Sequence, residues 1–436
     1  MSVSFRLLIV LLFARVVVAA EPNEVPPPIY DEDAIPHFVL PEVLVCEDGS
    51  KVQTADDWTS KRRPELLKLF AEEMFGNVPR AAENLVITSK VVEEGEVMAG
   101  KAVRRQVELL VSRKDGKGQL VLRLLMYVPK SDKPVPAFIG LNFKGNQTIA
   151  NDAKIHLNPG WVRPSNDGTV VDNKATEASR GTSASRWPVE LIVSRGYAVG
   201  TMYYGDIDPD FDDGFENGIQ GLVKGDSEKK LAGNEWGSIA GWAWGLSRIL
   251  DYLETDEQID AKHVGVVGHS RLGKTSLWAG AADERFAFVV SNDSGCGGAA
   301  LSRRRYGESV HRINTSFPHW FCDNYVKYNS NEGAMAFDQH ELIALMAPRP
   351  VYVASATEDQ WADPHGEYLS CYYADPVYRL LGTNGLGGEA PVLTPPGPDD
   401  PRATGQIGYH LRTGKHDINE YDWTQYLNFA NRHFAK

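Results

Sequence analysis

The chain has 436 residues, of which 42% are hydrophobic and 24% charged, and this balance excludes wholesale disorder as well as collagen-like or coiled-coil structure. Its formal net charge of -13 argues against nucleic acid and against anionic membrane surfaces as partners. A chain of this length can bury a core that needs neither disulfides nor a metal for stability.

The first twenty residues have the pattern of a signal peptide. Arg6 precedes an apolar run from Leu7 to Ala14, and the segment closes on the small residues Val18-Ala19-Ala20. The run is too short to span a bilayer, and no run of 18 apolar residues occurs elsewhere in the sequence. We therefore expect removal of residues 1–20, a secreted or periplasmic protein without membrane contact after processing, and a single domain over residues 21–436.

The next segments predict an irregular arm, a helix and a hairpin. Residues 22–57 are rich in proline and show no regular period. Apolar residues at helical spacing predict a helix over Arg63–Phe75 that ends at Gly76. Two strand-like segments, around Arg105–Ser112 and Leu120–Tyr127, flank a glycine-containing turn. This pattern predicts a hairpin of two antiparallel strands.

From residue 136 onward, short apolar runs alternate with helical stretches, which is typical of a parallel sheet covered by helices on both faces. The expected strands are Pro136–Leu141, Tyr197–Tyr203, Val264–Val267, Phe286–Val290, Pro350–Ala356 and Ile407–Thr413. The expected helices are Ser238–Leu253, Lys274–Ala282 and Trp423–Phe434. Residues 146–185 and 205–236 are long polar insertions of the kind that form the rim of a site.

The acidic and cysteine-containing segments predict no metal site. The segment Asp208–Gly214 is acidic but lacks the glycine and glutamate positions of an EF-hand loop, so we expect a solvated acidic loop. No C-x-x-C pair occurs. Export would permit a disulfide between Cys296 and Cys322; the alternative is four free buried thiols, at Cys46, Cys296, Cys322 and Cys371.

The most informative stretch is Val264–Lys274. An apolar strand runs into Gly268-His269-Ser270, and a segment compatible with a helix follows, which predicts a nucleophile elbow that presents the Ser270 hydroxyl at the top of the sheet. Leu272 stands where the second glycine of G-x-S-x-G belongs, and Gly273 follows one residue later. The alternative interpretation is a Gly-x-Ser turn that only packs a strand against a helix.

Suitable partners follow in the chain order serine, acid, histidine. Asp359 lies on the loop after the strand Pro350–Ala356, and His416 lies between the last strand and the last helix. His410 falls inside the last strand and is expected to be a packing residue. The predicted chemistry is acyl transfer, in which Ser270 attacks a carbonyl after His416 takes its proton. The backbone amide of Arg271, or its guanidinium, could stabilise the oxyanion.

Four segments resemble glucuronoyl esterases, carbohydrate esterase family 15. Residues Gly268–Lys274 are similar to the G-C-S-R-x-G-K motif of that family, Asn292–Gly298 to the segment it carries one strand later, and Glu358–Asp363 and Gly414–Asp417 to its bacterial members. The resemblance extends over roughly residues 40–436. It implies an α/β-hydrolase fold, a three-layer sandwich with a mostly parallel central sheet and long loop insertions. It also implies cleavage of esters between lignin alcohols and the 4-O-methyl-glucuronic acid branches of glucuronoxylan, without a metal or other cofactor.

The resemblance also implies roles for individual residues. Ser270 would be the nucleophile, His416 the base and Arg271 a contributor to the oxyanion hole. Three further residues would contact the sugar: Lys274, Glu308 and Trp361. From the residues alone, Lys274 fits a solvated helix position equally well, Glu308 an ordinary ion pair, and Trp361 a buried core position. Trp320 is expected in the core.

Two departures from the fungal pattern matter. Fungal members bridge a cysteine before the serine to a cysteine after the histidine; here these places hold His269 and Asp417, so that disulfide is absent. The catalytic acid is open between Asp293, at the fungal position, and Asp359, at the position of many bacterial members. We favour Asp359, because Asp293 is one methylene shorter than the fungal glutamate and reaches less far.

Three other functions compete with this hypothesis. An acetyl xylan esterase or another carbohydrate ester hydrolase would use the same triad on a different acyl group. A serine peptidase with this fold usually carries an added domain, for which the chain has no room. A catalytically inactive carbohydrate-binding protein is disfavoured because a serine, a histidine and two acids are all retained. We expect a monomer.

Overall fold

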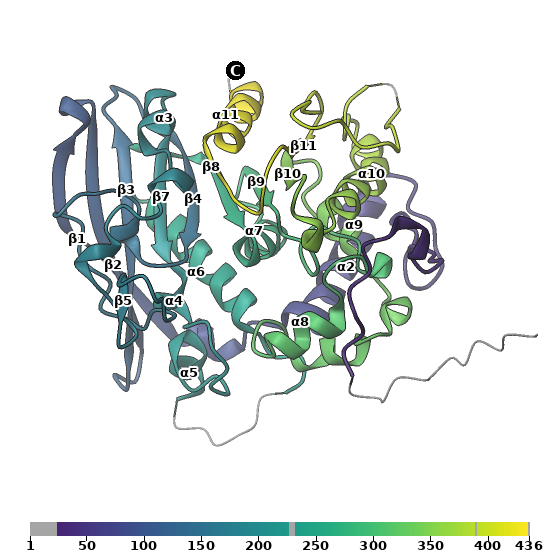
Figure 1. The fold of residues 1–436 in the computed structure, drawn as a ribbon, viewed down its shortest axis with the longest axis horizontal. Coiled ribbons are helices and arrows are strands. Elements are labelled where there is room, and N and C mark those ends of the chain that lie inside the picture. Colours follow the sequence, from purple (N-terminus) through teal and green to yellow (C-terminus); the bar gives the residue numbers. More distant parts are fainter. Residues whose placement is uncertain (1–23, 226–231, 389, 435–436) are drawn as a thin grey trace, which may run out of the picture.

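The computed structural model describes residues 24–225, 232–388 and 390–434, so the predicted signal peptide lies outside the described residues. Figure 1 shows a large twisted sheet with helices packed against it. The sheet has nine strands in the order β1-β2-β3-β7-β4-β8-β9-β10-β11. The strands are β1 Leu85–Val97, β2 Ala102–Arg113, β3 Gln119–Pro129, β4 Val135–Asn142, β7 Ala198–Tyr203, β8 Ile259–His269, β9 Phe288–Asn292, β10 Val351–Ala356 and β11 Ile407–Arg412.

The sheet combines an antiparallel edge with a parallel body. The strands β1, β2, β3 and β7 pair antiparallel in that order, and every pairing from β7 through β4 to β11 is parallel. A separate two-stranded ribbon joins β5 (Val170–Val171) and β6 (Lys174–Ala175) within the first long insertion. Because the parallel strands all end at the same edge, the loops that follow β8, β9, β10 and β11 meet there.

Helices cover both faces of the sheet, which gives three layers. The described helices are α1 Ala55–Asp57, α2 Arg63–Phe70, α3 Val189–Ser194, α4 Tyr204–Ile207, α5 Gly218–Lys224, α6 Ser238–Leu253, α7 Arg271–Ala282, α8 Val310–Ser316, α9 Gln339–Ala344, α10 Pro364–Leu380 and α11 Glu420–Phe434. In Figure 1, α3 and α11 lie on one side of the sheet and α6 and α7 on the other.

Alternation along β4 shows how this sandwich is packed. Ala137, Ile139 and Leu141 join the large core beneath α6, α7, α9 and α10, whereas Phe138 joins the second core beneath α3 and α11. A strand buried on both faces must be apolar at every position, which is why these strands appear in the sequence as continuous apolar runs. The predicted α/β-hydrolase architecture is confirmed.

Several elements were not expected from the sequence, among them β1 and α10. The strand β1 has mostly exposed or half-exposed residues and a charged centre, as suits the edge of a sheet. The helix α10 contains Pro376, a residue that normally interrupts a helix. The helix predicted over Arg63–Phe75 is regular α-helix only to Phe70 and continues to Phe75 with π-type turns.

The structure decides the state of the cysteines. Cys46, Cys296, Cys322 and Cys371 all lie within the described ranges and are free and buried, so the Cys296–Cys322 disulfide does not form. Burial raises the pKa of the Cys296 thiol. Among the residues described, no helix is both long enough and apolar enough to cross a membrane.

Candidate active site

The predicted nucleophile elbow sits between β8, which ends at His269, and α7, which begins at Arg271. Ser270 adopts φ +57° and ψ -129°, and its N–H donates to the carbonyl of Asn292 at 2.8 Å. A side chain at Gly268 would meet the Leu272 carbonyl at 1.8 Å, and one at Gly273 would meet Ser294 at 2.9 Å. The turn therefore needs glycine two residues before the serine and three residues after it, which explains why Leu272 is tolerated.

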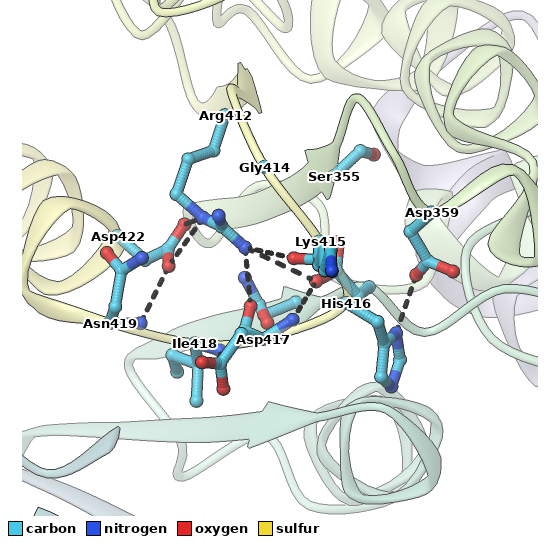
Figure 2. A network of polar contacts seen from close by, with 12 residues as sticks. Ser355, Asp359, Arg412, Gly414, Lys415, His416, Asp417, Ile418, Asn419 and Asp422 are labelled. Carbon is cyan, nitrogen blue, oxygen red and sulfur yellow. Dashed lines mark hydrogen bonds and ion pairs between the residues drawn. The ribbon is translucent and has the colours of Figure 1, made fainter. Parts of the chain in front are cut away.

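His416 and Asp359 are brought together from different loops. The His416 Nδ1 atom and the Asp359 Oδ2 atom lie 2.6 Å apart, and Figure 2 shows the two side chains facing each other. Asp359 is buried, whereas the His416 side chain is 42% exposed. Ser270 and His416 line one cavity, together with Phe143, Arg163, Arg186 and Tyr204. In a serine hydrolase, the base shares a cavity with the serine and is hydrogen-bonded to a buried acid. His416 has both features.

A second histidine packs against the base. The His269 ring centroid is 4.5 Å from that of His416, and its Nδ1 lies 2.6 Å from Asn292 Oδ1. Burial, followed by the nearby positive charges of His416 and Arg186, holds the pKa of His269 well below its ordinary value. A neutral ring at this position gives His416 a packing partner that does not repel the imidazolium formed during reaction.

Asp293 belongs to the same cluster but has different contacts. It follows β9 with a φ of +45°, and its Oδ2 accepts the Asp417 N–H at 3.2 Å. One polar atom each of Asp293, Asp359 and His416 lies within 4.8 Å of the others. Burial, followed by the negative charges of Glu367 and Asp359, raises the pKa of Asp293 well above its ordinary value. Side chains of these types can ligate a metal; here the His416 Nδ1 atom is hydrogen-bonded to Asp359.

Glu367 bonds the segments that carry both acids, and this role was not expected from the sequence. This fully buried residue of α10 accepts the N–H groups of Ser294 and Gly295 at 2.8 and 2.9 Å, and the Ser355 hydroxyl at 2.6 Å. It thus joins the turn after Asp293 to the strand that leads to Asp359. Burial raises the pKa of Glu367 to about 7. No local pattern distinguishes this glutamate from an ordinary helix residue.

On the other side of Ser270, Arg271 is held by an acid. Its guanidinium bonds the Asp210 carboxylate and lies 4.8 Å from the Trp320 ring centroid and 5.7 Å from that of Phe143. The backbone N–H of Arg271 opens α7 and so has no partner within the helix. Arg271 can therefore offer an amide and a fixed cation near the reacting carbonyl, the two contributions that the sequence suggested.

The prediction of a solvated acidic loop at Asp208–Gly214 is wrong. Asp208 and Asp210 are 3% and 1% exposed, and only the later part of the segment reaches solvent. Besides Arg271, Asp210 accepts hydrogen bonds from Arg163, Tyr204, His319 and Trp320. Burial raises the pKa of Asp210, but the His319 hydrogen bond and the charge of Arg271 outweigh this effect. The pKa of Asp210 therefore lies below its ordinary value. Trp320 is buried, as expected, but it contributes this polar contact as well.

The three predicted sugar contacts lie together: Lys274 comes one helical turn after Ser270 in α7, and Glu308 and Trp361 come from later loops. Lys274 donates to the Ser294 carbonyl, and its Nζ lies 3.9 Å from Glu308 Oε2. The Glu308 N–H donates to the Trp361 carbonyl at 3.0 Å. Burial raises the pKa of Glu308, an effect that the Lys274 charge opposes. The Trp361 side chain is 40% exposed, which excludes the alternative of a buried core position.

Comparison with known proteins agrees with this geometry. The fold is that of an α/β-hydrolase, and the geometry of the site fits a serine hydrolase. A family model described as "Glucuronyl esterase, fungi" matches residues 230–382, which include the elbow and Asp359. A relative named Carbohydrate esterase MZ0003, from an unknown prokaryotic organism, is 50% identical over 407 residues, 93% of this chain and 92% of its own length.

Two solved structures are similar over nearly the whole chain. A promiscuous CE15 esterase from a marine bacterial metagenome has a TM-score of 0.86 and 49% identity, covering 93% of this chain and 100% of that one. The glucuronoyl esterase from Solibacter usitatus has a TM-score of 0.83 and 44% identity, and the match covers 92% of this chain and 99% of that one. The chain belongs to the glucuronoyl esterases, carbohydrate esterase family 15. It is a carboxylic ester hydrolase.

Proposed function

We propose that this enzyme hydrolyses the ester between a glucuronic acid, with or without a 4-O-methyl group, and the alcohols of lignin, acting on glucuronoxylan. The name of the Solibacter usitatus relative supports the uronate acyl group. The observation that carries the proposal is the Lys274–Glu308–Trp361 cluster, because the triad alone does not distinguish one ester from another. A cation, a carboxyl group and a half-exposed indole suit the hydroxyl groups and the apolar face of a sugar ring.

The reaction proceeds through an acyl-enzyme. His416 takes the proton of the Ser270 hydroxyl, and the oxygen attacks the ester carbonyl to give a tetrahedral oxyanion beside Arg271. The same imidazolium then donates its proton to the leaving alcohol. Water repeats the sequence on the acyl-enzyme and releases the free uronate. Asp359 keeps the His416 proton on Nδ1, so that the other ring nitrogen faces the serine.

The test compares two substrates and several variants. The wild-type enzyme should hydrolyse benzyl glucuronate, and Ser270→Ala should abolish that turnover. Trp361→Ala should raise the KM for benzyl glucuronate about ten-fold while leaving aryl acetate hydrolysis unchanged, because an acetate has no sugar ring to lose. Tyr373→Ala is the matched control, since this tyrosine of α10 is similarly exposed, 37% against 40%, and lines a cavity that contains neither Ser270 nor His416.

The outcomes separate the competing functions. Turnover of aryl acetates with none of the uronate ester would contradict the proposal and favour a deacetylase. Equal loss of both activities in Trp361→Ala would show that the indole supports the triad rather than the sugar. Lack of reaction with both substrates and with a serine-directed fluorophosphonate, in folded protein, would favour a non-catalytic binding protein.

We further propose that the enzyme acts outside the cytoplasm as a monomer. Support for export comes from residues 1–20, whose charge, apolar run and small residues at the end match a signal peptide. The substrate proposed here is a cell-wall polymer, which an exported enzyme can meet. N-terminal sequencing of the secreted protein should begin near Glu21; retention of residues 1–20 would contradict the proposal.

A further inference from the structure

Arg412 is the last residue of β11 and lies four positions before His416. It is buried, with 5% of its surface exposed. Its Nη2 donates to the carbonyls of Lys415 and Asp417 at 2.8 and 2.9 Å, the two residues that flank His416. Figure 2 shows the guanidinium inside the curve of this loop, with its hydrogen bonds spread over both limbs.

The Nε atom of the same guanidinium is bound to α11. Arg412 Nε lies 3.2 and 3.1 Å from the two carboxylate oxygens of Asp422, which is fully buried. Asp422 also accepts from the His410 ring at 2.8 Å and from the Asn419 N–H at 2.8 Å. The loop that carries His416 is therefore tied at both ends to one buried ion pair.

This connection matters because the His416 side chain has little else to hold it. It is 42% exposed, and within the described ranges it has one side-chain hydrogen bond, with Asp359, and one ring contact, with His269. The position of the imidazole thus depends on the position of its backbone, which Arg412 holds from both neighbouring carbonyls. A displacement of about 1 Å at a catalytic group can cost about 10²-fold in rate.

We propose that Arg412 is a positioning residue, which holds the 413–419 loop so that His416 faces both Asp359 and Ser270. The proposal rests on the proposed serine-esterase mechanism. Lysine cannot replace arginine here, because a single ammonium group has no planar fork with which to bond a carboxylate and two carbonyls at once.

The variant Arg412→Lys keeps the charge next to Asp422 but loses the fork. We expect kcat for benzyl glucuronate to fall about ten- to a hundred-fold with KM nearly unchanged, and the rate of Ser270 labelling by a fluorophosphonate to fall in parallel. A purely structural role would lower the melting temperature without this effect on the folded enzyme. The labelling rate needs no sugar, so it stays informative even if the natural substrate is a different ester.

Arg349→Lys is the matched control. Arg349 also donates to two backbone carbonyls, Phe286 at 2.8 Å and Gly280 at 2.7 Å, but it lies at the start of β10, far along the strand from Asp359. We expect this variant to lose stability and to keep wild-type labelling. Wild-type labelling in folded Arg412→Lys, or an equal loss in Arg349→Lys, would overturn the proposal.

A second variant covers the case in which Arg412→Lys does not fold. Asp422→Asn preserves the shape of the partner and removes its charge, so Arg412 should hold the loop less firmly and labelling should slow about ten-fold. Unchanged labelling in that variant would also overturn the proposal. Absence of labelling in the wild-type enzyme would instead contradict the serine-esterase mechanism itself.

Discussion

The turn after β9 and the loop after β10 each place an aspartate within a few ångströms of His416, but the surroundings of the two acids differ. Asp359 bonds the imidazole directly at 2.6 Å. Asp293 instead accepts the Asp417 N–H, and its Oδ1 has no hydrogen-bond partner in the described part of the chain. Burial raises the pKa of Asp293 well above its ordinary value. Two carboxyl groups in one cluster can therefore have separate tasks, one orienting the base and one closing the loop behind it.

The largest effect is expected from Asp359→Asn. An amide in place of this carboxylate would favour the wrong tautomer of His416 and leave the imidazolium without an anionic partner. By analogy with the same change in other serine hydrolases, kcat should fall about 10³–10⁴-fold. Steady-state kinetics with benzyl glucuronate measures kcat. A fall in kcat of less than about ten-fold would contradict the different roles assigned to the two acids.

A smaller effect is expected from Asp210→Asn, which changes a third buried acid on the far side of Ser270. Arg271 would lose its charged partner without being removed, so kcat should fall about ten- to a hundred-fold, less than for deletion of an oxyanion donor. Asp206→Asn is the control, because Asp206 lies in the same insertion but pairs with Arg123 in another cavity. Equal losses in the two variants would show a general effect on the insertion rather than on Arg271.

Asp293→Asn should cost less than about ten-fold in kcat. Its raised pKa favours the neutral acid, which an amide resembles in shape, and an amide oxygen can still accept the Asp417 N–H. The kinetics of this variant should be measured beside those of Asp359→Asn. A ranking in which Asp293→Asn is the more damaged enzyme would reverse our assignment of the acid.

The smallest effect on turnover is expected from Glu367→Gln, which tests the support that both acids share. The folded-state pKa of about 7 lies above the ordinary value of 4.5, so the native state holds the proton more tightly than the unfolded chain. Stability from this group is complete below about pH 4.5 and is lost as the pH rises toward 7, by about 3 kcal/mol in total. The free energy of unfolding of Glu367→Gln, relative to wild type, should therefore increase over that range. If the difference in free energy of unfolding between the variant and the wild type did not change with pH, the raised pKa would be contradicted.

Much of the fold could be predicted because its signals are local. The strands β4, β7, β8, β9, β10 and β11 are short apolar runs, and the order of strands then places loops such as those of Ser270, Asp359 and His416 at one edge. The edge strand β1 escaped prediction, since its charged and half-exposed residues carry little hydrophobic pattern.

The parts of the site that could not be predicted are polar contacts between distant segments. Asp210 looked like one residue of a solvated acidic run, yet its carboxylate is buried against Arg271, His319 and Trp320, which lie 61 to 110 positions away. Arg412 falls within the expected strand Ile407–Thr413, and Glu367 lies in a helix that was not expected; the sequence singled out neither residue. Burial of a charged side chain is decided by partners that no local pattern reveals.

The most direct test of the account is the rate at which a fluorophosphonate labels Ser270 in the wild-type enzyme, Asp359→Asn and Asp293→Asn, followed by intact mass at one temperature where all three are folded. We predict that labelling slows by at least about 10²-fold in Asp359→Asn and by less than about ten-fold in Asp293→Asn. Fast labelling of Asp359→Asn together with slow labelling of Asp293→Asn would contradict the proposed Ser270–His416–Asp359 triad.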